Sequence, residues 1–123
     1  MANPIGERFV RALADKNTDE LKAMLRTDVD FRAMTPGSFW EANGIDSLVD
    51  DILLGQWFAP EDRITGVGHI DTDDVGPRSR IGYRLTVISP DGEYLVDQQA
   101  YYETDGDRIS WLRIMCAGYL PTG

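Results

Sequence analysis

The sequence predicts an α+β domain in which three N-terminal helices pack on one face of an antiparallel sheet. Two patterns support this fold class. Apolar residues recur at helical spacing up to residue 57, and from residue 61 onward they alternate with polar residues as they do in strands. Strong turn signals separate the alternating segments. Because no repeat, low-complexity tract or linker interrupts the 123 residues, we expect a single domain over 1–123.

The first two helices are predicted from their capping residues. Asn3-Pro4 should start the first helix, since asparagine caps helix N-termini and proline suits the first helical position. The apolar stripe of this helix consists of Ile5, Phe9, Ala12 and Leu13. Asn17 and Glu20 have the spacing of a capping box, which indicates a short second helix. Its apolar residues are Leu21, Met24 and Leu25.

The third helix has the clearest pattern in the chain. Its apolar residues recur three or four positions apart, and Asn43 is placed to cap its N-terminus. The stripe consists of Ile45, Leu48, Val49, Ile52, Leu53 and Trp57. Before this helix, "DVDFRAM" (28–34) alternates as a first strand does, and "TPG" (35–37) ends it.

Four further strands are expected after residue 61. Their sequences are "RITGVGHIDTD", "RSRIGYRLTVIS", "EYLVDQQAYYET" and "RISWLRIMCAGYL". The turns between them are Gly76-Pro77, Pro90-Asp91-Gly92 and Asp105-Gly106. A meander of this kind predicts an antiparallel arrangement with one face on the helices.

Turn geometry predicts which side chains of the last two strands share a face. With Asp105-Gly106 as a two-residue hairpin loop, the side chains fall into two sets. One face holds Asp97, Gln99, Tyr101, Ser110, Leu112, Ile114 and Cys116. The other holds Val96, Gln98, Ala100, Tyr102, Trp111, Arg113 and Met115. The second set is too apolar for a free surface, so we expect it to form an association face.

The position of Arg84 depends on the preceding turn. Pro90 cannot donate a ladder hydrogen bond, which favours a three-residue loop over 90–92. In that register Arg84 faces outward, and the inward residues of its strand are Ile81, Tyr83, Leu85 and Val87. A two-residue loop would instead make Arg84 the partner of Asp97.

The composition excludes several classes of partner. A formal charge of −9, from 21 acidic and 12 basic residues, argues against nucleic acid, whose binding needs a basic patch. The single cysteine, Cys116, provides no disulfide framework and indicates a reducing compartment. The start "MANPIGERFV" lacks the features of a signal peptide, and no apolar run approaches the ~20 residues that cross a bilayer. We therefore expect a cytoplasmic protein without a membrane partner.

Three stretches carry a resemblance to the nuclear transport factor 2-like superfamily, which includes SnoaL-like cyclases and ketosteroid isomerases. They are "ERFVRALADKNTDEL" (7–21), "DVDFRAMTPGSFWEANGIDSLVDDIL" (28–53) and "QQAYYETDGDRISWLRI" (98–114). The resemblance implies a cystatin-like α+β roll, in which the helices and a strongly curved sheet enclose a cone-shaped pocket. It also implies a small apolar or amphipathic ligand, no cofactor, and a homodimer through the outer sheet face carrying Tyr102, Trp111, Arg113 and Met115.

The resemblance places Asp97, Gln99 and Tyr101 in the pocket. Asp97 would act as general acid or base because an apolar surrounding raises a carboxyl pKa, although an ion pair is the alternative. Gln99 or Tyr101 would hold a ligand oxygen. His69, the only histidine, is a candidate proton shuttle or else a surface residue. The expected pocket walls are Trp40, Trp57, Tyr83, Leu85, Leu112 and Ile114, and no metal motif is present, since "DTDD" (71–74) fails the calcium-loop pattern.

The chain departs from the relatives it resembles at their reactive positions. Ketosteroid isomerases use a tyrosine, a base and a protonated aspartate, which fall here at Phe9, at Thr35 or Ala33, and at Gln99. The late acid of SnoaL-like cyclases and the second aspartate of the epoxide hydrolases are missing too. The predicted function is small-molecule binding, with cofactor-independent acid–base catalysis of the isomerase, cyclase, dehydratase or hydrolase type. The alternative is a non-catalytic ligand-binding or protein-association module.

Overall fold

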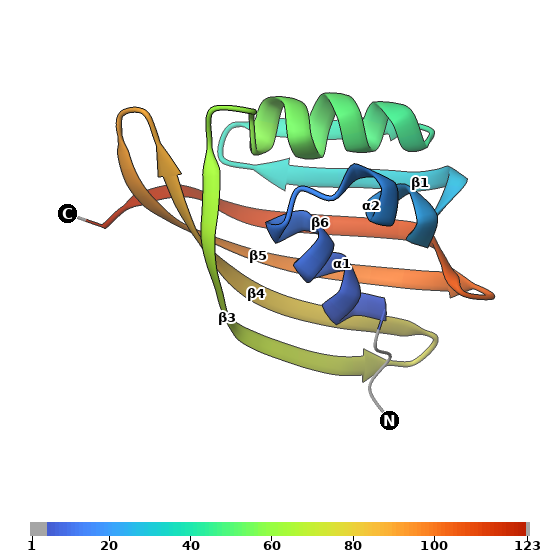
Figure 1. The fold of residues 1–123 in the computed structure, drawn as a ribbon. Coiled ribbons are helices and arrows are strands. Elements are labelled where there is room, and N and C mark those ends of the chain that lie inside the picture. Colours follow the sequence, from blue (N-terminus) through green and yellow to red (C-terminus); the bar gives the residue numbers. More distant parts are fainter. Residues whose placement is uncertain (1–4, 123) are drawn as a thin grey trace.

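Three helical segments and a six-stranded sheet make up the computed structural model, which describes residues 5–122 (Figure 1). The helical segments are α1 (Ile5–Ala14), α2 (Thr18–Met24) and η1 (Ser47–Trp57). The strands are β1 (Leu25–Thr35), β2 (Ser38–Asn43), β3 (Arg63–Val75), β4 (Arg78–Ser89), β5 (Gly92–Asp105) and β6 (Arg108–Pro121). The expected cap at Asn3-Pro4 lies outside the described residues.

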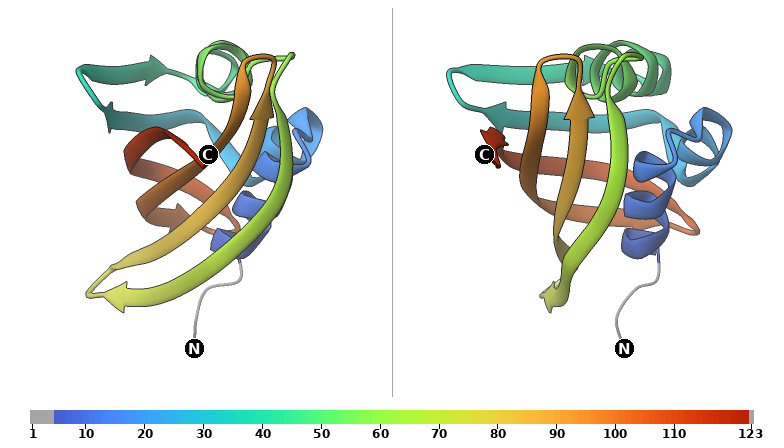
Figure 2. Two further views of the ribbon diagram at one scale, coloured as in Figure 1. Left: turned by 90° about the vertical axis from the view of Figure 1, so that its left-hand side faces the viewer. Right: turned by 60° about the vertical axis from the view of Figure 1, so that its left-hand side comes forward.

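The sheet has the order β2-β1-β6-β5-β4-β3 and is strongly curved (Figure 2). Helices α1 and α2 lie on its concave side, and η1 packs beside β1 and β2 (Figures 1 and 2). The predicted α+β fold class is confirmed. Two details differ from the sequence prediction: β1 pairs with β6 in parallel, and residues 38–43 form an additional strand, hairpinned to β1. None of the described helices combines the length and apolar character needed to span a membrane.

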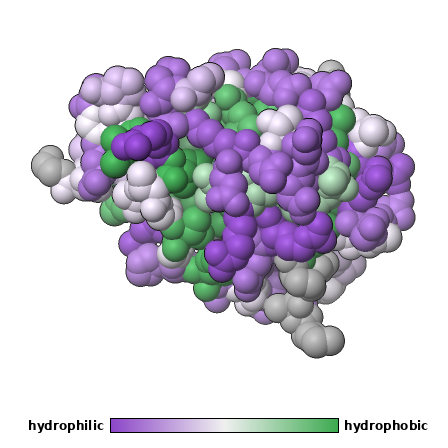
Figure 3. Space-filling view, in the orientation of Figure 1, coloured by the Kyte–Doolittle hydropathy of each residue, from purple (hydrophilic) through white to green (hydrophobic). Residues whose placement is uncertain are grey.

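The core lies between the concave side of the sheet and the helices. Helix α1 buries its predicted apolar stripe there, and Val10 in addition. Asn17 caps α2 as predicted, because its side-chain oxygen accepts a hydrogen bond of 3.1 Å from the Glu20 N–H. Polar residues cover most of the helix-bearing face of the molecule, with hydrophobic ones visible between them (Figure 3).

The third helical segment, η1, is a π-helix rather than the α-helix that the sequence predicts. The N–H of Phe58 bonds to the carbonyl of Leu53, five residues back, at 3.0 Å. The buried residues advance in steps of four and then five, which suits a turn wider than that of an α-helix. They are Leu48, Ile52 and Trp57 along one row, and Val49, Leu53 and Phe58 along the next. The expected cap involves the side chain of Asn43, which lies outside the described set.

The predicted face of β5 is wrong. The hairpin loop consists of Gly106 and Asp107, because Asp105 pairs with Arg108, and a bulge follows where Glu103 and Thr104 meet β6. The moved loop shifts the pairing by two residues and keeps the facing, whereas the bulge shifts it by one and reverses the facing of β5 relative to residues 111–116 of β6. The buried residues of β5 are therefore Val96, Gln98, Ala100 and Tyr102, opposite the buried Leu112, Ile114 and Cys116 of β6.

The turn between β4 and β5 also differs from the favoured prediction. Ser89 pairs with Gly92, so the loop has two residues, Pro90 and Asp91. In this register Pro90 again lies within the loop, so it does not need to donate a ladder hydrogen bond. Arg84 faces outward as expected, but opposite Asp97. The inward set Ile81, Tyr83, Leu85 and Val87 is confirmed as buried.

The π-helix should be sensitive to the loss of one glycine. A Cβ at Gly55 would lie 2.6 Å from the main-chain oxygen of Asp50, which cannot move without breaking the helix. We expect Gly55→Ala to lower the free energy of unfolding by about 1–3 kcal/mol, the usual cost of overpacking. Urea unfolding measures this. Gly68→Ala is the matched control, because nothing lies within 4 Å of its Cβ position, and an equal loss in both variants would contradict the prediction.

Candidate functional site

A small cavity lies where the C-terminal end of η1 meets the strands. Its volume is about 170 Å³. Strands β1, β2, β5 and β6 supply one side of the lining, and the end of η1 supplies the other. The lining residues are Thr35, Trp40, Gln56, Trp57, Phe58, Gln98, Cys116, Gly118 and Tyr119. Four of these nine residues are aromatic, and a few polar groups accompany them, which is the usual character of a small-molecule site.

Gln98 is the most deeply buried polar residue of this lining, with 1% of its surface exposed. The phenol of Tyr83 donates a hydrogen bond of 2.6 Å to its amide oxygen. Because the buried phenol must place its proton on an acceptor, the amide oxygen is turned toward Tyr83. The amide nitrogen of Gln98 makes no hydrogen bond to any of the described residues. The inward face of β5 thus brings an N–H donor without a protein partner to the cavity.

Trp57 brings a second donor. Its indole ring packs edge-on against Trp40, with centroids 5.9 Å apart, and against Phe31 at 6.0 Å. Its Nε1 is buried and has no hydrogen-bond partner within residues 5–122. Trp40 differs in this respect, since its own Nε1 donates to the Thr35 hydroxyl at 2.7 Å. A buried N–H left unpaired costs about 1–3 kcal/mol, so the exception at Trp57 calls for an explanation.

Tyr119 lies at the edge of the cavity and is held by two acceptors. Its hydroxyl is 2.6 Å from the Trp57 carbonyl oxygen and 3.1 Å from a carboxylate oxygen of Asp62. The Ser89 hydroxyl donates to the other oxygen of Asp62 at 2.6 Å. Burial and the charge of Asp62 raise the pKa of Tyr119 well above its usual range, so the phenol remains a neutral donor.

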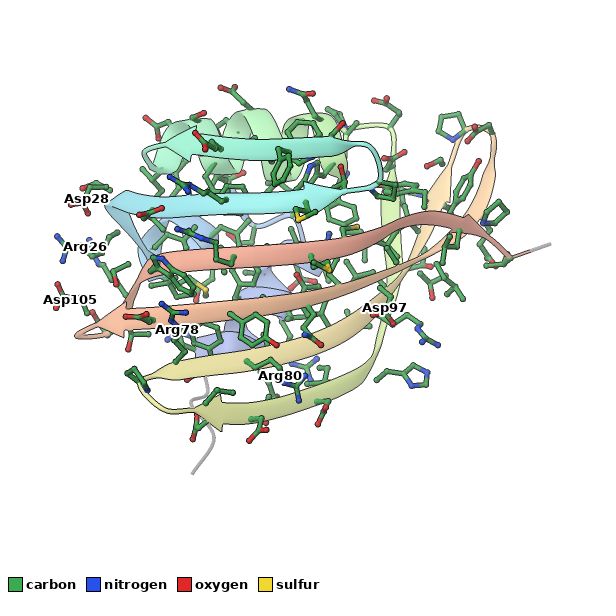
Figure 4. The ribbon with its side chains drawn as sticks, turned by 180° about the vertical axis from the view of Figure 1, so that it is seen from behind. Arg26, Asp28, Arg78, Arg80, Asp97 and Asp105 are labelled. Atoms are coloured by element: carbon green, nitrogen blue, oxygen red, sulfur yellow. The ribbon has the colours of Figure 1, made fainter. Side chains whose placement is uncertain are left out.

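The predicted polar site residues of β5 lie on the opposite side of the sheet. Asp97 is on the face turned away from the helices (Figure 4), where Arg84 donates to its carboxylate at 3.0 Å. Gln99 and Tyr101 share that face and hydrogen-bond to each other at 3.0 Å. Their predicted position in the pocket is wrong, for the register reason given above. The ion pair that was the alternative for Asp97 is present.

The other predicted site residues have mixed positions. Trp40 and Trp57 line the cavity, and Tyr83 contacts it through Gln98. Three more are buried: Leu85, Leu112 and Ile114, the last of which also lines a groove on the outer face. His69 is exposed and adopts a left-handed backbone conformation, with φ of 53°, at a bulge of β3. Sequence reasoning missed Asp62, Gln98 and Tyr119; for Gln98, the apolar alternation of Val96, Ala100 and Tyr102 around it was a usable signal.

No group of three or more His, Cys, Asp or Glu side chains within the described residues is arranged to hold a metal ion. The chemistry of the cavity is that of neutral donors and aromatic walls.

No protein-family model matches the chain, and a search of curated protein sequences gives no match either. Solved structures do match. A provisionally assigned isomerase from Rhodopseudomonas palustris superposes with a TM-score of 0.74 at 17% identity, over 94% of this chain and 91% of its own. An LEH-like epoxide hydrolase from M. tuberculosis gives 0.69 at 18% identity, over 90% of this chain and 78% of its own. An NTF2-like protein from Burkholderia xenovorans gives 0.65 at 14%, over 91% and 86%. The chain therefore has the nuclear transport factor 2-like fold.

The Tyr83–Gln98 hydrogen bond has a pH signature. Burial raises the pKa of Tyr83 well above its ordinary value of 10. In the unfolded chain this phenol ionises near pH 10, whereas in the folded protein it stays protonated. The contribution of Tyr83 to the free energy of unfolding is therefore fully present below pH 10 and falls above it by ~1.4 kcal/mol per pH unit. Tyr83→Phe should cost about 1–3 kcal/mol at pH 7, because it leaves the Gln98 oxygen unpaired.

The same variant should lose this disadvantage in alkali. At pH 11, we expect its deficit relative to the wild type to shrink by ~1.4 kcal/mol, because only the wild type has a phenol that ionises on unfolding at this position. Urea unfolding at the two pH values measures the deficit, and the remaining tyrosines cancel in the comparison. An unchanged deficit would contradict burial of a neutral phenol at Tyr83.

Proposed function

We propose that the protein binds a small, neutral organic molecule in the cavity at the end of η1, by hydrogen bonds to an acceptor oxygen of that molecule. One observation carries the proposal. Two deeply buried side chains of the same cavity lining, Gln98 and Trp57, each keep an N–H without a partner in the described residues. A ligand carbonyl, ether or ester oxygen would satisfy such donors. Aromatic walls would cover the rest of a ligand of this size.

The donor pair favours a neutral ligand oxygen over a charged one. Neither an arginine nor a lysine lines the cavity, so a carboxylate or phosphate would lose its water without gaining a counter-charge. Two neutral N–H groups can still polarise a carbonyl, as the donors of an oxyanion hole do. If the protein is an enzyme, this is the electrophilic half of an isomerase or hydrolase site.

The basic half of such a site would have to come from Asp62. The carboxylate adjoining the cavity belongs to Asp62, and both of its oxygens already accept hydrogen bonds, from Ser89 and Tyr119. No carboxylate lines the cavity itself. A general base must reach the proton that it removes. We therefore propose ligand binding as the primary function and acid–base turnover through Asp62 as the alternative.

A pair of matched probes tests the binding mode. Cyclohexanone should bind more tightly than methylenecyclohexane, which has nearly the same shape but no acceptor oxygen. Trp57→Phe keeps a ring and removes the N–H, so it should weaken cyclohexanone binding about 5- to 10-fold, the worth of one hydrogen bond. It should leave methylenecyclohexane binding unchanged. Calorimetric or NMR titration measures both affinities.

The matched control is Trp40→Phe, which removes an indole N–H from the same cavity that already has a partner. Its effect on the two probes should be equal. The free protein gives a second readout: both variants lose the packing of an indole ring, but only Trp40→Phe also loses a protein hydrogen bond, so it should lower stability more than Trp57→Phe does. Equal affinity of the wild type for both probes would reject the proposed function.

A groove on the outer sheet face supports a second proposal, association with a second copy of the chain. The groove has a volume of about 300 Å³, and Phe39, Met34 and Met115 at its surface are 81%, 43% and 59% exposed. Arg32, Glu41 and Arg113 line it as well. A two-fold contact brings a patch against itself, and an apolar centre bordered by both signs of charge is complementary to its own copy.

The residues expected at this interface need one revision. Trp111, Arg113 and Met115 lie on the outer side, where the Trp111 ring is held between the guanidinium groups of Arg78 and Arg113, 4.1 and 4.4 Å from its centroid. Tyr102 is 2% exposed on the inner side and is removed from the set. Phe39 and Met34 are added to it.

Disruption of the groove should give a monomer. We expect the wild type to sediment as a dimer at micromolar concentration and Phe39→Glu to sediment as a monomer, since a buried unpaired carboxylate is costly. Val75→Glu is the control, because Val75 is a 52% exposed apolar residue at the end of β3, outside the groove. A wild type that sediments as a monomer, or a Val75→Glu variant that dissociates equally, would reject this association.

A further inference from the structure

A second hollow adjoins the cavity and shares Tyr119 with it. It is a groove of about 470 Å³ between the start of β3, the β4–β5 turn and the end of β6. The lining residues are Glu61, Asp62, Ser89, Pro90, Asp91, Tyr94 and Tyr119. Three of these seven side chains are carboxylates, and none is basic. The proposed ligand of the cavity does not require this concentration of negative charge.

The carboxylates of the groove differ in how far they are satisfied. Asp62 is buried and accepts two hydrogen bonds, so its charge is dispersed within the protein. Glu61 and Asp91 are exposed, and neither forms a salt bridge with any of the described residues. Lys16 balances part of the charge from outside the groove, where its ammonium group bonds to the carbonyls of Ala59 and Asp62 at 2.5 Å. The groove therefore keeps a negative potential.

The same groove has an aromatic wall. The rings of Tyr94 and Tyr119 lie 5.5 Å apart and are inclined by 52°. Burial raises the pKa of both tyrosines, and the Tyr119 hydroxyl donates to Asp62 at 3.1 Å, so both phenols are neutral and their ring faces keep the electron-rich character that attracts cations. Aromatic faces combined with nearby carboxylates are the recognition elements used for alkylated ammonium groups.

An inorganic cation would need a different arrangement. Calcium and magnesium require several oxygen ligands around one point. The acidic residues described in this groove do not form a group of that kind. A cation with a large radius and weak hydration matches dispersed charge and ring faces better than a metal ion does.

From these observations we infer that the groove is a subsite for an alkylated ammonium group. The inference rests on the proposed function, because the unpartnered donors of the adjoining cavity indicate that a ligand is present, and Tyr119 lines both hollows. The ligand would then be a small alkylamine derivative, with its acceptor oxygen in the cavity and its ammonium group over Tyr94 and Tyr119.

Choline and its neutral carbon isostere, 3,3-dimethylbutan-1-ol, test the subsite by NMR titration at low salt. Choline should bind at least about five-fold more tightly than the isostere. Tyr94→Leu, which keeps apolar bulk and removes the ring face, should weaken choline by about five-fold, and Asp91→Asn by about three-fold. Asp107→Asn makes the same change of net charge at an exposed turn elsewhere and should have no effect.

The failure of each proposal has its own signature. Two results would overturn the ammonium subsite: equal affinity for the isostere and choline, or an equal loss of choline affinity in Asp107→Asn and Asp91→Asn. Neither result would affect the Trp57-dependent binding of cyclohexanone. Choline binding without any cyclohexanone binding would instead reject the proposed function and retain the groove. Acetylcholine joins the two: it should be weakened by both Tyr94→Leu and Trp57→Phe, whereas choline should respond to Tyr94→Leu alone.

Discussion

The hydrogen bond between Tyr83 and Gln98 is the constraint on which the cavity depends. A glutamine in the core of a sheet is tolerated only if its polar atoms are satisfied, and the 2.6 Å bond from Tyr83 satisfies the oxygen. That bond fixes the orientation of the amide and leaves the nitrogen as the group facing other partners. Two neighbouring strands, β4 and β5, place the two side chains, so the polarity of the cavity is set by the sheet and not by a loop.

The π-helix supplies the second part of the arrangement. Its wide turn carries the chain from Leu53 to Phe58 so that Trp57 packs against Phe31 and Trp40 while its carbonyl accepts from Tyr119. Among the buried side-chain polar atoms of the described residues, the indole N–H is the one left without a hydrogen-bond partner. A fold selected for stability alone would lose nothing by replacing that N–H with carbon. Its position at the end of a π-helix, an element often found at functional sites, fits a role in binding.

Sequence reasoning recovered the fold class and most of the buried residues because both follow from periodicity. Sequence reasoning failed for β5, where a shift of one residue in the strand pairing decides which side chains face the core. The bulge at Glu103 and Thr104 carries no sequence signal stronger than that of the Asp105-Gly106 turn beside it, and a single shift exchanges Asp97 and Gln99 for Gln98. The parallel pairing of β1 with β6 joins segments about eighty residues apart, which local patterns do not report. The cavity residues Asp62 and Tyr119 were missed for the same reason, since only the fold brings them together.

Charge is distributed differently on the outer face of the sheet and in the groove beside Tyr119. On the outer side of the sheet several carboxylates are paired with arginines, as in Arg84 with Asp97 and Arg80 with Asp71; Asp97 and Arg80 are labelled in Figure 4. Such exposed pairs contribute little to stability but leave no net field. The groove beside Tyr119 has carboxylates without arginines, so part of the net charge of −9 is concentrated in a hollow that shares Tyr119 with the neutral cavity. A field of that sign attracts a cation and repels an anion before any contact is made, and it selects among molecules that the cavity alone would accept equally.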